Sequence, residues 1–578
     1  MAAEVFTRTS GNWRRFERET KELPEVVAGI NIKEERILRQ EMLQSRVKGF
    51  LDVKGRKIVN GDGEEILLTG WGLGNWLLCE GYMWLGNGSE RFDRPRRIEA
   101  VIEELTGREY AAGFWKRFRE TYIAEEDIRY IAGLGYNSIR IPINSRLFMA
   151  QEPGEILFLE EGFALLDRCI SWCKKYGLYA FLDLHGAPGG QTGANIDDSI
   201  DDMPRLLLDQ DCFDKGIALW REIASRYKDE WIVGGYDLLN EPIRPKRTES
   251  DPDVDYLLPR LQEFYEKAIA AVREVDKRHL FTLEGHHWAT DTSVFHKKYD
   301  DKMVIHFHRY GCLPDLSGYQ EFTELSERLD CPLWLGETGE SVIEWYTAMY
   351  PLAAELSIGY NIWPYKKMEC VNSPCSVKKP KDWELLTDYA RQGKNPGYRK
   401  AREILEEYLE NIKLSNCTLH PEVTRAAFRQ PGCVIRGTDF DQFPGKGISF
   451  SGLRREDNIY KYRMGTGMQI RNRFPDCRQG FGFDSKWKRF VLVLGEKEFA
   501  CYSLFDIKEG SGIRIHLFAN ADAEVVVFEG DRELGSCKLK AGDERQEIGP
   551  FSLTQAPEST LRIETVRGEV EIEDIITM

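Results

Sequence analysis

Two carboxylic acids in this sequence have the surroundings that acid–base chemistry on a sugar bond requires. Glu241 follows a short apolar run in YDLLNEP, and Glu337 ends another apolar run in LWLGET. If both runs are strands of one sheet, the two acids leave it at the same edge and can flank a glycosidic bond. Hydrolysis with retention needs carboxyl groups about 5–5.5 Å apart, whereas inversion leaves about 6.5–9.5 Å for a water molecule. Each motif alone also suits an ordinary turn, so the residues that accompany the acids decide between the two interpretations.

Short apolar segments alternate with longer amphipathic helical patterns through the middle of the chain. Their continuous apolar character is typical of strands buried on both faces, as in a parallel sheet. Eight β–α repeats predict an α/β fold, a (β/α)₈ TIM barrel, whose working residues lie at the carboxyl ends of the strands. A doubly wound open sheet is the alternative. The predicted strands are 66–71, 137–143, 178–185, 235–239, 280–284, 303–308, 333–337 and 359–363.

We expect three parts along the chain. Residues 1–45 are charged and predict an N-terminal arm, residues 46–415 the barrel, and residues 421–578 an all-β sandwich. The barrel part is expected to begin with a hairpin that pairs 49–54 with 65–70. For the sandwich, carbohydrate binding and a purely structural role both remain open. Its predicted strands are 490–494, 499–505, 512–518, 524–528, 535–539 and 560–565.

Composition restricts the class of partner. The 578 residues include 79 basic and 95 acidic side chains, a net charge of −16, which argues against nucleic acid or anionic lipid and permits a neutral carbohydrate. No apolar run is long enough for a membrane span, and no apolar signal segment is seen at the N-terminus. Thirteen Cys without CxxC pairs favour a reducing, cytoplasmic location, although a secreted protein with its signal removed would look the same. No cluster demands a metal, and no cofactor is expected.

The ordered polar residues at the predicted strand ends resemble glycoside hydrolase family 5, the cellulase-like retaining β-glycosidases of clan A. The resemblance covers about residues 48–410, and HGAPGGQ is also similar to the exo-β-1,3-glucanase branch of that family. It implies an eight-fold barrel and a catalytic rim. The matching residues are Arg140 in NSIRIP, His185 in FLDLHG, Asn240 and Glu241 in LLNEP, His308 and Tyr310 in VIHFHRY, Glu337 in LWLGET, and Trp363 in GYNIWPYK.

The resemblance implies a role for each matching residue. Glu337 would be the nucleophile, and Glu241 would protonate the leaving oxygen and later activate water. Arg140 and Tyr310 would hold Glu337 ionised and oriented. Asn240 would donate to the sugar 2-hydroxyl, His185 and His308 would bind hydroxyls or orient the acid, and Trp363 would offer its indole face to the sugar. Three alternatives stay open: Arg140 as a structural ion pair, His185 as a cap of the following loop, and Trp363 as core packing.

The sequence therefore predicts a glycoside hydrolase without a cofactor, a retaining β-glycosidase that acts from the chain end on β-glucosides or short β-glucan oligosaccharides. The aromatic loop with Trp76, Tyr82 and Trp84 would either narrow the cleft into a pocket or merely cover the barrel. The same mechanism on a β-mannoside, a β-1,3-glucan, a glycolipid or a furanoside is an alternative. A sugar-binding protein without catalysis is a further one.

Overall fold

The structure is a computed structural model that describes residues 46–453, 458–473 and 489–578, apart from residues 87 and 250. The predicted arm, residues 1–45, lies outside the described residues. None of the helices in the described ranges has the length and apolar character needed to cross a membrane.

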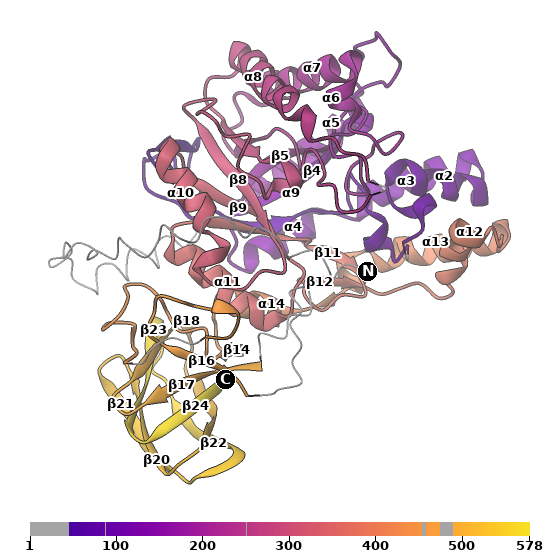
Figure 1. Ribbon diagram of the computed structural model, residues 1–578. Helices are drawn as coiled ribbons and strands as arrows, with labels where there is room; N and C mark the ends of the chain where they lie inside the picture. The colour runs from indigo at the N-terminus through magenta and orange to yellow at the C-terminus, as the bar shows by residue number, and fades with distance from the viewer. Residues whose placement is uncertain (1–45, 87, 250, 454–457, 474–488) are drawn as a thin grey trace.

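In the part of the chain that the structure describes, eight parallel strands close into a barrel in the order β10-β3-β4-β5-β6-β7-β8-β9. Figure 1 shows helices packed around this barrel. The closed sheet confirms the predicted (β/α)₈ barrel and excludes the doubly wound alternative. The strands are β3 (Thr69–Gly72), β4 (Ser138–Asn144), β5 (Tyr179–Gly186), β6 (Val233–Asp237), β7 (Leu280–Glu284), β8 (Met303–Arg309), β9 (Leu333–Gly339) and β10 (Gly359–Trp363).

Capping residues determine where two of the outer helices begin or end. Asp209 caps the helix Gln210–Tyr227 (α7), because its side chain accepts the backbone N–H of Cys212 at 3.0 Å. Gly177 ends the helix Glu160–Tyr176 (α5) in a left-handed conformation with φ 73°. The other helices beside the barrel are α2 (Pro95–Thr106), α3 (Arg108–Thr121), α4 (Glu125–Gly133), α8 (Leu258–Val275), α10 (Gln320–Leu329), α11 (Ile343–Glu355), α12 (Glu384–Gln392) and α13 (Tyr398–Asn411).

The expected hairpin exists with a different partner strand. β1 (Asp52–Lys54) pairs with β2 (Lys57–Val59), and Lys54 lies opposite Lys57. A two-residue turn therefore joins them, and Gly55 supplies the positive φ of 58° that such a turn needs. The predicted pairing of 49–54 with 65–70 was wrong because the tight turn forms within the first part of the segment.

The C-terminal part is an antiparallel β-sandwich, as predicted. One sheet has the order β16-β17-β24-β19-β22 with β14 beside β24, and the other has the order β15-β18-β23-β20-β21. Residues of β20 alternate between buried and half-buried, as expected for a strand with one face in a core. The strands are β14 (Val434–Arg436), β15 (Phe450–Ser451), β16 (Gln469–Asn472), β17 (Phe490–Gly495), β18 (Phe499–Ile507), β19 (Gly512–Ala519), β20 (Ala523–Glu529), β21 (Arg532–Leu539), β22 (Gly542–Ser552), β23 (Ala556–Arg567) and β24 (Glu569–Thr577).

The sandwich lies against the barrel near α11 and the short helix α14 (Pro421–Ala427), as Figure 1 shows. Buried Arg429 links the two parts: its Nε donates to the carbonyl of Thr347 in α11 at 2.7 Å, and its Nη1 donates to Asp441 at 2.7 Å. The backbone N–H of Arg463 in the sandwich part donates to Asp315 of the barrel at 2.9 Å. Polar contacts thus fix the junction.

Candidate active site

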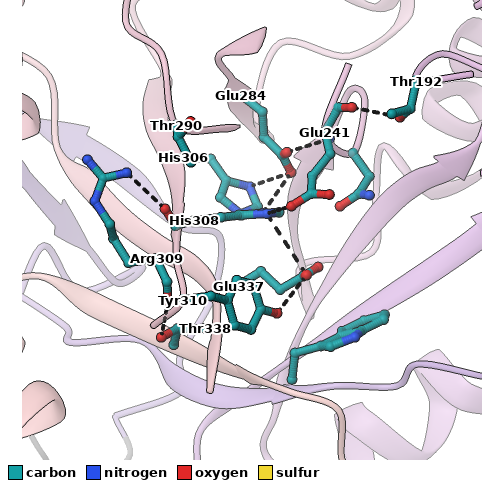
Figure 2. A network of polar contacts seen from close by, with 12 residues as sticks. Thr192, Glu241, Glu284, Thr290, His306, His308, Arg309, Tyr310, Glu337 and Thr338 are labelled. Atoms are coloured by element: carbon teal, nitrogen blue, oxygen red, sulfur yellow. Dashed lines mark hydrogen bonds and ion pairs between the residues drawn. The ribbon is translucent and has the colours of Figure 1, made fainter. Parts of the chain in front are cut away.

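Glu337 lies in β9 with its carboxylate held from two sides. Arg140, on β4, donates from Nη1 to Oε2 of Glu337 at 2.6 Å. Tyr310, directly after β8, donates its hydroxyl to Oε1 at 2.8 Å (Figure 2). A carboxylate that accepts two such hydrogen bonds is fixed in orientation and favoured in its ionised form.

Glu241 follows β6 and its backbone has a left-handed φ of 44°, a strained value for a residue with a side chain. Its N–H donates to Oε2 of Glu284 at 2.7 Å, and its carbonyl accepts the hydroxyl of Thr192 at 2.6 Å. On the side chain, Oε1 lies 2.7 Å from Nδ1 of His308. Figure 2 shows these contacts converging on Glu241 from three separate chain segments.

The two acids face each other across a narrow gap. Nδ1 of His308 lies 3.9 Å from Oε1 of Glu337, and carboxylate oxygens of Glu241 and Glu337 come within 4.8 Å of each other. Their side chains are 11% and 7% exposed, whereas the Arg140 side chain is fully buried. Both acids therefore reach solvent at the carboxyl ends of the strands.

Arg140 is also the centre of a buried ion-pair network. Besides Glu337 it contacts Asp237 at 2.7 Å, Glu284 at 3.0 Å and Asp183 at 3.2 Å. Arg140 thus has both of the arrangements considered above: it forms structural ion pairs inside the barrel, and it also contacts Glu337. Four carboxylates surround the one guanidinium of Arg140. Its planar group has several N–H donors that can bind them together, so an arginine fits this position better than the compact charge of a lysine would.

The surroundings set the charges of Glu337 and the nearby histidines. Burial would raise the pKa of Glu337, but the charges of His308 and Arg140 outweigh it and hold that pKa below its usual range. Burial would lower the pKa of His308, yet Glu284 and Glu337 raise it well above normal. For His185, burial and Arg140 lower the pKa to about 3. At neutral pH the site therefore holds an ionised Glu337, a cationic His308 and a neutral His185.

The remaining predicted residues lie beside the two acids. Oδ1 of Asn240 accepts from Nη2 of Arg140 at 2.8 Å, and its Nδ2 lies 3.2 Å from Nε2 of His185. The ring of His185 lies parallel to Trp363, with an angle of 6° and centroids 5.2 Å apart. Trp363 is only 3% exposed, and its Nε1 donates to the hydroxyl of Tyr82 at 3.0 Å. All eight predicted residues are brought together, while the sugar-stacking role of Trp363 stays a prediction.

Besides Asp183 and Asp237 of the Arg140 network, other acids and bases of this region were not predicted. Glu284 is the last residue of β7, and functional residues of a barrel lie at such strand ends. His306 lies two residues before His308 in β8, so both side chains point to the same face of the strand. Glu80 and Glu340 lie in loops, where the sequence carries no such signal. Burial, together with the charges of Glu337 and Glu340, raises the pKa of Glu80 well above its usual range.

The aromatic loop buries its tryptophans and places Tyr82 beside Trp363, whereas a narrowed cleft stays a prediction. Trp76 and Trp84 are almost fully buried, and Trp84 packs on Phe118 and Trp383. Tyr82 is 40% exposed and lies beside Trp363. The loop therefore anchors itself in the outer core and brings Glu80 and Tyr82 to the rim.

Two groups at this site bring imidazole and carboxylate atoms as close together as the ligands of a metal ion. They are Glu284 with His306 and His308, and Glu241 with His308 and Glu337. Within them, Nε2 of His308 lies 3.1 Å from Nε2 of His306, and its Nδ1 lies 2.7 Å from Glu241. The side chains thus satisfy one another by direct hydrogen bonds.

Comparison with known proteins places the barrel in a family. Residues 102–369 match the model for Cellulase (glycosyl hydrolase family 5). A β-xylosidase of Phanerodontia chrysosporium is 36% identical over 246 residues, which are 43% of this chain and 48% of the relative. Endoglucanase C of Acetivibrio thermocellus is 26% identical over 48% of this chain and 94% of its own length. Glucan 1,3-β-glucosidase of Candida oleophila is 28% identical over 38% of this chain and 51% of its own.

The matched region thus spans about half the length of the β-xylosidase and of the glucan 1,3-β-glucosidase. Residues 102–369, which match the family model, contain β4 through β10 and all eight predicted rim residues. Over residues 102–369, the barrel matches glycosyl hydrolase family 5.

Proposed function

We propose that the protein is a retaining β-glycosidase in which Glu241 and Glu337 act as a pair. The observation that carries the proposal is the separation of the two acids, whose oxygens approach within 4.8 Å. Double displacement uses carboxyl groups about 5–5.5 Å apart, and inversion requires a wider gap for water. The short separation supports retention.

In the first step Glu337 attacks the anomeric carbon while the bond to the leaving oxygen breaks. Glu241 gives its proton to that oxygen, so a free alcohol leaves and a glycosyl ester of Glu337 remains. Arg140 and Tyr310 hold the attacking carboxylate through two hydrogen bonds. Because His308 engages only Oε1 of Glu241, the proton to be transferred can sit on Oε2.

In the second step the roles of the two acids reverse. Glu241 takes a proton from water, the water oxygen attacks the anomeric carbon, and the carboxylate of Glu337 is released. The sugar leaves with the configuration it had in the substrate. Asn240, beside Glu241, is placed to bind the sugar 2-hydroxyl, an interaction that strengthens in the transition state.

We infer that the enzyme acts from the chain end on β-glucosides or short β-glucan oligosaccharides. Glu80 and Tyr82 from one loop and Glu340, paired with Lys367, from another lie around the Glu337 side of the cleft. Such groups support a closed sugar site, because a long polymer needs an open groove. The relatives are named for xylosides, glucans and β-1,3-glucans, so the sugar has to be decided by assay.

A panel of aryl β-glycosides, with glucoside, xyloside, mannoside, galactoside and furanoside members, tests the activity and the sugar. We expect the glucoside to have the highest kcat/KM, and NMR to show the β-anomer as the first product. Short glucan oligosaccharides labelled at the reducing end should lose single sugars from the opposite end. An α-anomer as the first product would refute the mechanism, and internal cleavage would refute the action from the chain end.

Azide separates the roles of the two acids. Glu337→Ala should lower kcat by about 10³-fold or more and, with azide and a good leaving group, yield the α-glycosyl azide. Glu241→Ala should instead yield the β-glycosyl azide from the glycosyl-enzyme. The exposed acid Glu266 offers a matched control, and Glu266→Gln should retain full activity. Turnover in Glu337→Ala equal to that of the unchanged protein would remove Glu337 from the mechanism.

A further inference from the structure

The turn after β7 has an unusual backbone. His287, Trp288 and Ala289 all have left-handed φ values, of 55°, 59° and 55°. Each such residue costs roughly 1–2 kcal/mol, and residues with side chains normally adopt this conformation singly. The N–H of His287 donates to the carbonyl of Ile243 at 2.8 Å, which ties the turn to the segment that follows Glu241. Strain of this kind persists where a side chain must be placed in a particular position.

The side chain placed by this turn is Trp288, which carries a guanidinium on its face. The Cζ atom of Arg247 lies 3.5 Å from the centroid of the indole ring. Arg247 is exposed, and its own backbone N–H donates to Asp251 at 3.1 Å. Over the described ranges of the chain, no carboxylate comes within ion-pair distance of its guanidinium. One face of the planar guanidinium thus packs on the indole ring of Trp288, and the N–H groups at its edges face no carboxylate of the described residues.

Arg247 belongs to the segment that follows Glu241, and it stacks on the turn that is tied to this segment. It follows Glu241 by six residues in NEPIRPKR, and the negative charge of Glu241 acts on its guanidinium. In the proposed mechanism Glu241 protonates the leaving oxygen, so groups beyond Glu241 and away from Glu337 face the leaving group. Acids gather instead on the sugar side, where Glu80 and Glu340 surround Glu337.

This division of charge has a chemical consequence. A guanidinium edge offers paired N–H donors in the geometry that carboxylate and phosphate oxygens accept, and a fork already held in place loses little freedom on binding. An oxyanion is repelled by the ionised Glu337 on the sugar side and attracted to Arg247. We propose that Arg247 and Trp288 form a leaving-group subsite that favours glycosides whose aglycone carries a carboxylate or phosphate group. The inference rests on the proposed glycosidase activity and adds to it the class of leaving group.

Paired substrates test this subsite. They are aryl β-glycosides of the preferred sugar whose leaving group carries a meta or para carboxylate, a phosphonate, or the uncharged carboxamide. The quantity measured is the ratio of kcat/KM for the anionic substrate to that for the carboxamide. Comparing this ratio between variants cancels the intrinsic reactivity of each leaving group. We expect Arg247→Gln to lower the ratio by about 2- to 5-fold, as the loss of a partly exposed charged pair does.

Two further variants distinguish a specific site at Arg247 from a general effect of nearby positive charge. Lys246→Gln removes a neighbouring exposed cation and should leave the ratio unchanged. Arg247→Lys keeps the charge without the planar fork and should lower the ratio partly. The carboxylate and phosphonate members decide which oxyanion the site prefers. An unchanged ratio in Arg247→Gln, or an equal fall in Lys246→Gln, would overturn the subsite while the glycosidase proposal stands. No turnover of any neutral aryl glycoside would overturn both.

Discussion

The carboxylate of Glu284 accepts the backbone N–H of Glu241 at 2.7 Å. Glu284 is fully buried, and the N–H that it binds belongs to a residue with a left-handed φ of 44°. The same carboxylate contacts Arg140 and His308 through its other oxygen, at 3.0 and 3.4 Å. One buried acid therefore supports the backbone of Glu241 and the charge of the imidazole beside it.

We expect Glu284→Gln to lower kcat by about 10- to 100-fold, because small misplacements of a catalytic group have effects of this size. The sugar contacts are untouched, so KM should change little. Glu284 also raises the pKa of His308, so the variant should lower that pKa. NMR titration of the His308 ring measures it. Normal kcat with an unshifted His308 would show that Glu284 has only a structural role.

The pH profile tests the interaction between His308 and Glu337. His308 is the first of the charges that lower the pKa of Glu337 against the effect of burial. In the proposed mechanism Glu337 must be ionised to attack, so activity should be lost as the pH falls through its pKa. His308→Gln removes a positive charge, so the pKa of Glu337 should rise and the acid limb of kcat/KM should move to higher pH.

Exposed His296 is the matched control, and His296→Gln should leave the profile where it was. An acid limb that stays in place in His308→Gln, or moves to lower pH, would contradict the charge interaction. Tyr310→Phe removes a hydrogen bond to Glu337 without a charge, and should move the limb in the same direction by less.

The rim of the barrel could be predicted from the sequence because its signals are local. A polar residue at the carboxyl end of a buried strand is visible without any partner, and Glu284 fits the same rule although it was not singled out. The contacts between these residues depend on barrel closure and register. His308 lies opposite Glu337 at a register shift between β8 and β9, and no local pattern specifies such a shift.

The sandwich shows a different limit. Strand β24 lies in the middle of its sheet, between β17 and β19, yet its sequence EVEIEDIIT is acidic. Arginines form ion pairs with the acids of this central strand: Arg436 contacts Asp574 at 3.2 Å, and Arg473 contacts Glu571. Strand β22 is largely exposed and polar. Strand β22 lacks the apolar alternation on which the other strands were recognised, and in β24 that alternation is interrupted at Asp574.

Arg429 offers a test of how firmly the two parts of the chain are joined. Its side chain is 3% exposed and bonds both to Thr347 of the barrel and to Asp441. Removing one partner of a buried pair leaves an uncompensated charge and costs about 3–5 kcal/mol. Arg429→Met should lower the free energy of unfolding in urea by this amount. Arg425→Met, on the exposed face of α14, is the control, and equal stability in both variants would refute the role of Arg429.

Glu80 gives a test on the sugar side of the cleft. Burial and the neighbouring acids raise its pKa well above the usual range, which favours the neutral carboxylic acid. Gln has nearly the same shape and is also neutral, so Glu80→Gln should keep kcat/KM within about threefold, whereas Glu80→Ala removes the polar group and should raise KM. In the unchanged protein, ionisation of Glu80 at higher pH adds a negative charge beside Glu337 and should reduce activity there. Glu80→Gln cannot ionise, so its kcat/KM should stay higher at the basic end of the profile. A Glu80→Gln variant as impaired as Glu80→Ala at neutral pH would mean that Glu80 acts as a carboxylate instead.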